Sequence, residues 1–331
     1  AVSQPTIANV NFLPDWTIAG RFASQLWKEA GEAPIDGVLS VTPGFLRRLL
    51  EVTGPLEVPA YGETVAADNI IDRFAFHTRQ VALRLEDNSV RKGFAGQVAA
   101  AVLNKSLVMP RSRWKDLGIA LGKGFDNREA MMWSPDATVA DSLRGRRWDG
   151  TLPQGNGDFF YNSEFSFGAK NGRTLRRTFD HHVVLNADGS GVITTTMTVA
   201  NSTPRDRLNP TSMVYVAAYG PTGARFSANS VNAIVPHDVS LAGHPSAGFF
   251  VDPPPFDQAK FTVVWTVPTL AIDLPGRGWS YDLRFMHVPD HTGDIVNLRV
   301  DLPRGWKWKG AKPPVQSPLD VDLVGSWKYG P

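Results

Sequence analysis

The hydrophobic pattern of this chain changes its period about half-way along, and this change restricts the fold more than any other feature. Over residues 17–147 apolar side chains recur every three or four positions, the spacing of one face of an α-helix. From about Gly157 onward they alternate with polar side chains, as half-buried β-strands do. The sequence therefore predicts an α+β protein with two domains, residues 1–150 and residues 151–331, and a boundary within residues 145–158.

A stretch in which Pro and Gly residues closely separate short apolar runs lies near the start of the helical half. Residues 33–59 read APIDGVLSVTPGFLRRLLEVTGPLEVP, which predicts a buried strand, a helix and a second strand with almost no spare residues. Thr42 is a typical N-cap, Pro43 suits the first helical position, and Gly54 suits the helix end. Such short connections favour the central layer of a mixed sheet. The helix that follows this unit is expected to use Asp68 as its N-cap.

The second half is predicted to be an antiparallel β-sandwich. Two alternating runs flank Asp188 and Gly189, a dipeptide that is typical of a tight hairpin turn. The other strand candidates are short and are separated by Pro and Gly, as in sandwich domains. These candidates are TSMVYVAAY, AKFTVVWTVPT, WSYDLRFMHV, DIVNLRVDLP and LDVDLVGSW.

Composition excludes several classes of protein. A net charge of +2 over 331 residues is no polybasic signature, so no nucleic-acid partner is expected. The chain has no cysteine, which excludes disulfides and thiolate metal sites. No apolar run is long enough for a membrane span. The ten Trp, 25 Pro and 30 Gly favour an extracytoplasmic protein.

A search for common catalytic motifs finds no nucleophile elbow, no zinc-protease motif and no phosphate-binding loop. The adjacent His181 and His182 face opposite sides of a predicted strand, so they are poor co-ligands. Residues 287–294, HVPDHTGD, could gather two His and two Asp around a metal, although an ordinary loop is the preferred interpretation. No catalytic residue is assigned, and no metal site is predicted.

The segment RLEDNSVRKGF, residues 84–94, is the strongest candidate for a ligand site. Arg91 and Lys92 fall in the first turn of a predicted helix, where each cation opposes the helix dipole at a cost of roughly 0.3–1 kcal/mol. A bound anion, held by free backbone N–H groups and these side chains, would offset that cost. The alternative is that Glu86 or Asp87 simply pairs with Arg91. Both interpretations stay open.

A second candidate surface lies near the C-terminus, in GWKWKG (305–310) and GSWKYG (325–330). Trp306 and Trp308 lie between lysines, an arrangement that suits stacking on sugars or a protein interface. The alternative is that the two indoles alternate across a strand, with one buried and the other exposed.

Several motifs occur together in the order of a known family. The chain resembles the domain-of-unknown-function 4012 family of bacterial envelope proteins over most of residues 9–201. The motifs that carry this resemblance are NFLPDW (11–16), residues 33–59, AADN (66–69), DNSVRKGF (87–94), RWDGTLPQGNGDFF (147–160) and FGAKNGRTLRR (167–177).

That family in turn resembles the LytR-CpsA-Psr proteins, which transfer glycopolymers from a lipid pyrophosphate onto the cell wall. The resemblance implies an N-terminal α/β/α layer with a mixed sheet, and it places Arg91 at a pyrophosphate-contacting position. The acidic metal ligands of that group lie before the equivalent of NFLPDW. Activity is therefore not carried over, and the chain is interpreted as the C-terminal part of a longer, membrane-anchored precursor.

Three functional hypotheses follow. The leading one is an extracytoplasmic cell-envelope protein with a structural or glycan-binding role and no cofactor. The second is a phosphotransferase that acts on polyprenyl-pyrophosphate-linked glycans, with Arg91 holding the pyrophosphate and Mg²⁺ as cofactor. The third is an adhesin or surface-filament subunit. The carboxylates that could serve Mg²⁺ are Asp15, Asp36, Asp68, Asp72 and Asp87.

The resemblance also implies a partner for the first domain. DGVLSV, residues 36–41, is apolar on both faces apart from Ser40, as expected for a strand with a neighbour on each side in a sheet covered by helices. Leaving such a strand at an edge would expose backbone donors. We therefore expect the N-terminal half of the same precursor, or another envelope subunit, to complete the sheet.

Overall fold

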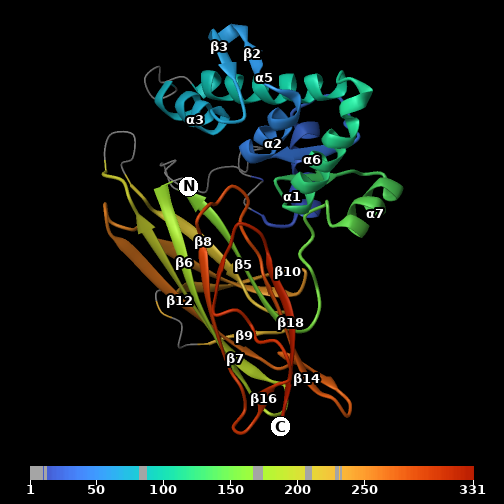
Figure 1. Ribbon diagram of the computed structural model, residues 1–331. Helices are drawn as coiled ribbons and strands as arrows, with labels where there is room; N and C mark the ends of the chain where they lie inside the picture. Colours follow the sequence, from blue (N-terminus) through green and yellow to red (C-terminus); the bar gives the residue numbers. More distant parts are fainter. Residues whose placement is uncertain are drawn as a thin grey trace. The chain divides into compact units, whose positions relative to one another are not determined.

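The computed structural model describes residues 10, 13–81, 88–166, 174–205, 211–227, 231 and 233–331. The chain divides into two compact units, Ala1–Thr151 and Leu152–Pro331, and each is described by itself. Helices dominate the first unit and strands the second (Figure 1). The change of hydrophobic period along the sequence thus corresponds to a change of secondary structure.

The first unit is built mainly from amphipathic helices. Its longer helices are α1 (Trp16–Glu29), α2 (Pro43–Thr53), α3 (Ile70–Ala75), the π-helical η3 (Phe76–Val81), α5 (Asn88–Leu107), α6 (Trp114–Asp126) and α7 (Ala137–Arg146). Two 3-10 turns, η2 (Pro59–Tyr61) and η4 (Arg111–Arg113), connect them. No helix in the described ranges is both long and apolar enough to cross a membrane.

Side-chain caps explain where three of these helices begin. The Thr42 hydroxyl accepts a hydrogen bond from the Phe45 amide at the start of α2, as the sequence predicts, and Pro43 occupies the first helical position. Asp15 caps α1, and Asp136 caps α7. The prediction for Asp68 is wrong, because α3 begins one residue later with Asn69 as the N-cap residue.

In the part of the first unit that the structure describes, the strands form two separate two-stranded sheets. Strand β1 (Val38–Val41) pairs antiparallel with β4 (Ala130–Trp133), and β2 (Leu56–Val58) pairs antiparallel with β3 (Glu63–Val65). The expectation of one mixed sheet across the strand-helix-strand unit is therefore wrong. The turn η2 brings β3 directly back onto β2, so β2 takes a local partner instead of joining β1.

The core of the first unit lies between helices. Phe45, Leu46, Leu49 and Leu50 form the buried face of α2, and they pack with apolar residues of α5 and α6. A smaller cluster joins α1 to the β1–β4 sheet. There Gly20 allows the close approach, because a Cβ at this position would lie 2.5 Å from Cβ of Trp133.

The described residues of the second unit form fourteen strands in two sheets. The larger sheet contains β5 (Asp158–Ser166), β8 (Val214–Tyr219), β10 (Ala233–Leu241), β11 (His244–Val251), β13 (Ala271–Leu274), β14 (Gly278–Phe285), β16 (Lys307–Trp308) and β18 (Leu323–Gly330). The smaller sheet contains β6 (Leu175–Leu185), β7 (Gly191–Asn201), β9 (Arg225–Phe226), β12 (Gln258–Val267), β15 (Ile295–Asp301) and β17 (Gln316–Pro318).

The two sheets form a sandwich around one apolar core. Buried and partly exposed residues alternate along β6 and β7, the pattern of strands with one face in a core. Most pairs are antiparallel, but β14 runs parallel to β5 and β15 runs parallel to β6. The prediction of an antiparallel sandwich thus holds for most strand pairs and fails for these two. Figure 1 shows the long strands of this unit lying together.

Candidate binding site on the large sheet

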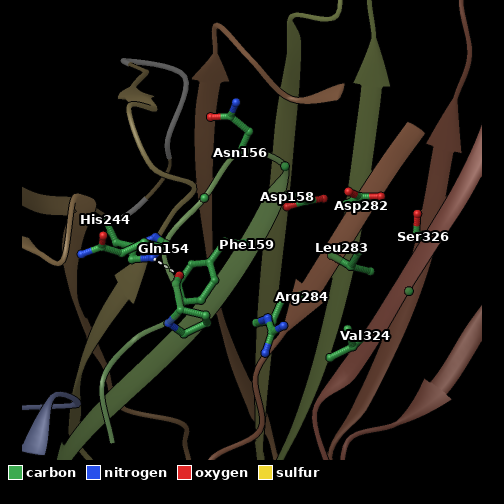
Figure 2. Close-up of a pocket in the computed structure, with 14 residues that line it drawn as sticks. Gln154, Asn156, Asp158, Phe159, His244, Asp282, Leu283, Arg284, Val324 and Ser326 are labelled. Atoms are coloured by element: carbon green, nitrogen blue, oxygen red, sulfur yellow. Dashed lines mark hydrogen bonds between the residues drawn. The ribbon is translucent and has the colours of Figure 1, made fainter. Parts of the chain in front are cut away.

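A pocket of about 410 Å³ opens on the large sheet, between a glycine-rich loop and strands β14 and β18. Asp282 and Arg284 belong to β14, and Val324 and Ser326 to β18 (Figure 2). Asp282 pairs with Ser326 across the two strands, and each is less buried than its sequence neighbours, Asp282 on β14 and Ser326 on β18. The pocket therefore uses the face of the sheet that points away from the core.

The loop of residues 153–157 needs its glycines. The backbone of Gly155 and Gly157 has φ values of 135° and 111°, which side chains other than glycine rarely adopt. A Cβ at Gly157 would also lie 2.9 Å from the carbonyl oxygen of Asp282. This close approach brings the loop onto β14, so the loop forms one wall of the pocket.

His244 fixes the other end of this loop. Its Nε2 lies 2.9 Å from the carbonyl oxygen of Pro153, and its Nδ1 lies 2.8 Å from that of Gly220. The imidazole stacks on the ring of Phe159, with centroids 3.8 Å apart. Figure 2 shows His244 and Phe159 on the same side of the pocket. The contact with Gly220 and the stacking on Phe159 thus fix His244 on the sheet, and its contact with Pro153 holds the loop there.

The lining of the pocket is chemically mixed. It offers the carboxylate of Asp282, the guanidinium of Arg284, the hydroxyl of Ser326 and the carboxamides of Gln154 and Asn156. Ser280, next to the pocket on the same face of β14, donates to Asp282 at 2.7 Å and lies 2.9 Å from the Ser326 hydroxyl. Within the described ranges, the side chains of Gln154 and Asn156 make no hydrogen bond to the protein. These two carboxamides therefore present donors and acceptors that are available to a ligand.

A buried polar network lies behind the pocket. Nε2 of His181 lies 2.9 Å from Oδ2 of Asp158, and Nδ1 of His181 lies 2.8 Å from Oγ1 of Thr195. The Tyr281 hydroxyl donates to the same Asp158 oxygen at 2.6 Å. Burial, together with this carboxylate, raises the pKa of Tyr281 well above its usual value.

This network has the residue types of a catalytic triad but no access for a substrate. Thr195 is fully buried and His181 is 1 % exposed, so the hydroxyl that would act as nucleophile cannot be reached. Asp158 and Tyr281 lie on the larger sheet, whereas His181 and Thr195 lie on the smaller one. The network therefore joins the two sheets, and its role is structural.

A second buried network contains charged groups. Arg177 makes a two-point ion pair with Glu164, with both contacts at 2.6 Å, and its backbone amide donates to Asp294. Burial is the largest single influence and would raise the pKa of Glu164, but the charges of Arg177 and His291, together with the hydrogen bonds from Arg177 and Asn162, lower the pKa below its ordinary value. The pair lies at the start of β6, where it links β5 to the loop before β15.

Comparison with known proteins gives one family. Residues 2–76 match the model of a family described as "Protein of unknown function (DUF4012)". This match supports a relationship between the chain and the DUF4012 family. It ends at the first residue of η3, so the DUF4012 match includes none of the sandwich unit. The description of the family assigns no activity to the chain.

No curated protein matches the chain. Solved structures similar to the chain include an M1 zinc metallopeptidase from Deinococcus radiodurans, at 16% identity and a TM-score of 0.26, and a two-domain M1 zinc metallopeptidase bound to L-tryptophan, at 15% identity and a TM-score of 0.25. Each covers 48% of this chain, and this chain spans 43% of each. At TM-scores this low, neither likeness supports an argument about fold or activity.

The predicted anion site at the start of α5 lies largely outside the described residues. Asp87 lies outside the described residues, and so do the side chains of Arg91 and Lys92, although α5 runs through both positions. The helix begins at Asn88, so Arg91 falls in its first turn as the sequence indicates. The anion site at this helix start stays a prediction.

The carboxylates suggested for Mg²⁺ have other surroundings. Asp15 is used as the cap of α1, where it accepts hydrogen bonds from the amide and hydroxyl of Thr17. Asp36 and Asp68 are exposed, and Asp72 lies in the first turn of α3. In the part of the chain that the structure describes, no three His, Cys, Asp or Glu residues come together in a way that could hold a metal.

The two indoles predicted to form an aromatic surface, Trp306 and Trp308, are both packed against the sandwich. Trp306 and Trp308 are both partly buried and both pack against the sandwich core. The ring centroids of Trp306 and Tyr329 lie 5.7 Å apart, as do those of Trp308 and Tyr329. The idea of one buried and one exposed indole is wrong, because Trp306 precedes β16 and turns back onto the same tyrosine.

Side chains within residues 287–294, which the sequence offers as a possible but not preferred metal site, make hydrogen bonds within the protein. Nδ1 of His287 lies 2.7 Å from Asp322, and Asp294 accepts from the Arg177 amide. The sequence does not predict the pocket, because its residues lie on β14, β18 and a loop more than a hundred residues earlier. Two glycines close together in QGNGD were the one available signal.

Proposed function

We propose that the protein is an extracytoplasmic cell-envelope protein whose sandwich unit binds a glycan in the pocket between residues 153–157 and strands β14 and β18. The observation that carries the proposal is the lining of this pocket: a carboxylate, a guanidinium, a hydroxyl and two carboxamides on a scaffold held by His244. A saccharide offers neighbouring hydroxyls that donate and accept, and such a lining can satisfy both roles.

The size and rigidity of the site support a small saccharide unit over an extended polymer groove. A volume of about 410 Å³ falls within the usual range for small-molecule pockets. Its floor consists of two paired strands, which hold Asp282 and Ser326 in fixed positions. A preformed site of this kind loses little conformational freedom when it binds.

Titration calorimetry with soluble peptidoglycan fragments and neutral oligosaccharides tests the proposal. The double variant Gln154→Ala/Asn156→Ala should weaken binding by about tenfold, because two hydrogen bonds are lost. The matched control is Gln25→Ala/Asn104→Ala. It also removes one glutamine and one asparagine carboxamide, from α1 and α5, and this variant should bind normally. Absence of binding by the unaltered protein, or equal binding by both double variants, would refute the proposal.

We further propose that a strand of a second polypeptide, most simply the N-terminal half of the same precursor, completes the sheet of a LytR-CpsA-Psr-like layer around β1. Within the described residues, β4 is the one strand that pairs with β1, and Leu39 is 43 % exposed. An apolar strand with one unpaired edge is a template for another strand. Hydrogen exchange at residues 38–41 should slow on adding that partner, and unchanged exchange in its presence would refute the pairing.

A further inference from the structure

The turn between α5 and α6 exposes apolar side chains that a globular unit usually buries. Leu107 and Val108, at the end of α5, are 76 % and 81 % exposed, and Trp114, at the start of α6, is 56 % exposed. The Trp114 indole N–H donates to the carbonyl oxygen of Met109 at 3.0 Å, which holds the ring against the turn. We call residues 105–123 the α5–α6 tip.

The charge of this tip is strongly one-sided. Between residues 105 and 123 there are five Lys or Arg residues and one acidic residue, Asp116. Asp116 forms an ion pair with Arg113. The sequence context therefore leaves a positive surface around the exposed apolar side chains.

Two of the five cations have structural tasks and three do not. Lys105 donates to the carbonyl oxygens of Gly54 and Pro55, and Arg113 donates to that of Val52, so both secure the tip to the end of α2. Among the described residues, the side chains of Arg111, Lys115 and Lys123 make no hydrogen bond or ion pair. These three cations are available to an external anion.

The outward face of α6 repeats the same combination. Ile119 is 50 % exposed and lies one helical turn from Lys115 on one side and one turn from Lys123 on the other. The opposite face of α6 packs into the core through Ala120 and its neighbours. An exposed isoleucine between two lysines thus continues the surface that begins at the turn.

We propose that the α5–α6 tip binds the surface of an anionic lipid bilayer. Leu107, Val108 and the Trp114 ring would enter the boundary between headgroups and acyl chains, where aliphatic side chains and indoles are favoured. Arg111, Lys115 and Lys123 would face the lipid phosphates. The charge complementarity favours an anionic membrane over a second copy of this chain, because two positive tips would repel one another.

Vesicle flotation with the full chain tests this surface. Vesicles of phosphatidylcholine and phosphatidylglycerol should bind the protein, vesicles of phosphatidylcholine alone should bind it much more weakly, and added salt should reduce binding. Lys115→Gln/Lys123→Gln should lower partitioning by about fivefold per cation. Leu107→Ser/Val108→Ser should lower it by about tenfold or more.

Matched controls distinguish vesicle binding by the α5–α6 tip from non-specific binding by other exposed side chains. Val315→Ser/Val321→Ser removes two exposed valines from the sandwich unit, and Arg304→Gln/Lys312→Gln removes two exposed cations there. Both controls should bind like the unaltered protein. Equal losses in tip and control variants, absence of binding to phosphatidylglycerol vesicles, or loss of a dimer in the Leu107→Ser/Val108→Ser protein would overturn the proposal.

A labelling experiment checks insertion independently of affinity. The chain has no cysteine, so Val108→Cys gives a single position for an environment-sensitive fluorophore. Emission should shift to the blue on anionic vesicles for Val108→Cys and stay unchanged for Val315→Cys. No shift at Val108→Cys, or the same shift at both positions, would contradict the proposal.

Discussion

The two units differ in the size of their sheets and in the groups that fill their cores. Among the described residues of the first unit each sheet has two strands, and the core is formed mainly by helices that pack on one another. In the second unit long strands form two sheets, and buried polar and charged groups join them across an apolar core. The core of the first unit thus rests mainly on helix packing, whereas the core of the second is also crossed by buried polar and charged pairs.

The largest effect is expected when the buried ion pair of the sandwich is broken. Arg177→Met removes the partner of Glu164, whose side chain is 8 % exposed, and leaves a buried carboxylate without its counter-charge. Such a loss costs about 3–5 kcal/mol of unfolding free energy. Urea denaturation measures the change.

The exposed ion pair of Arg205 and Asp252 supplies the control for that variant. Its side chains are 46% and 38% exposed, so Arg205→Met should cost less than about 1 kcal/mol. Similar costs for the two arginine variants would show that the buried pair is not a key element of the sandwich.

A large but more local effect is expected in the helical unit. Leu49 of α2 is fully buried among other apolar side chains, so Leu49→Ala should cost about 2–5 kcal/mol. If the two units unfold independently, calorimetry should show one transition at a lower temperature and the other unchanged. Leu283→Ala in the sandwich should give the converse, and a joint shift in either variant would show that the units unfold together.

Two buried tyrosines on adjacent strands sharpen the comparison within the sandwich. Tyr281 donates to Asp158, so Tyr281→Phe should cost about 1–3 kcal/mol because the buried carboxylate loses a donor. The hydroxyl of Tyr329 is buried without a partner among the described residues, so Tyr329→Phe should be neutral or slightly stabilising. Equal destabilisation by the two substitutions would contradict this assignment.

The smallest effect is expected from acid. Burial opposes ionisation of Glu164, but Arg177 lowers its pKa below the ordinary 4.5. A lowered folded-state pKa contributes stability above that ordinary value and loses it as pH falls through the folded-state pKa. Unfolding free energy should therefore decline below about pH 4.5, and Arg177→Met should flatten the decline. An unchanged slope in this variant would show that other carboxylates control acid unfolding.

Local signals in the sequence predict local structure well. Thr42 and Pro43 locate the start of α2, and the Asp188-Gly189 turn joins β6 to β7 with Leu185 opposite Gly191. These features depend on neighbouring residues, whose backbone preferences and caps are visible in the sequence.

The sequence predicts less well which strands pair when they lie far apart along the chain. The predicted strands do not include β10 and β11, and the prediction of an antiparallel sandwich does not include the parallel pairs β5–β14 and β6–β15. Alternation of apolar residues fixes which face of a strand is buried but not which strand lies beside it. The pocket depends on such pairings, so the sequence indicates its glycines but not the partners that make them a site.

The pairing of β1 with β4 has a consequence for synthesis on the ribosome. Helix α2 can form as soon as it emerges, because its cap, proline and apolar face are all local. Strand β1 must wait for β4, which follows α6 in the chain. Until then its apolar side chains are without their strand partner, and a chaperone that binds nascent chains would find an extended hydrophobic target there.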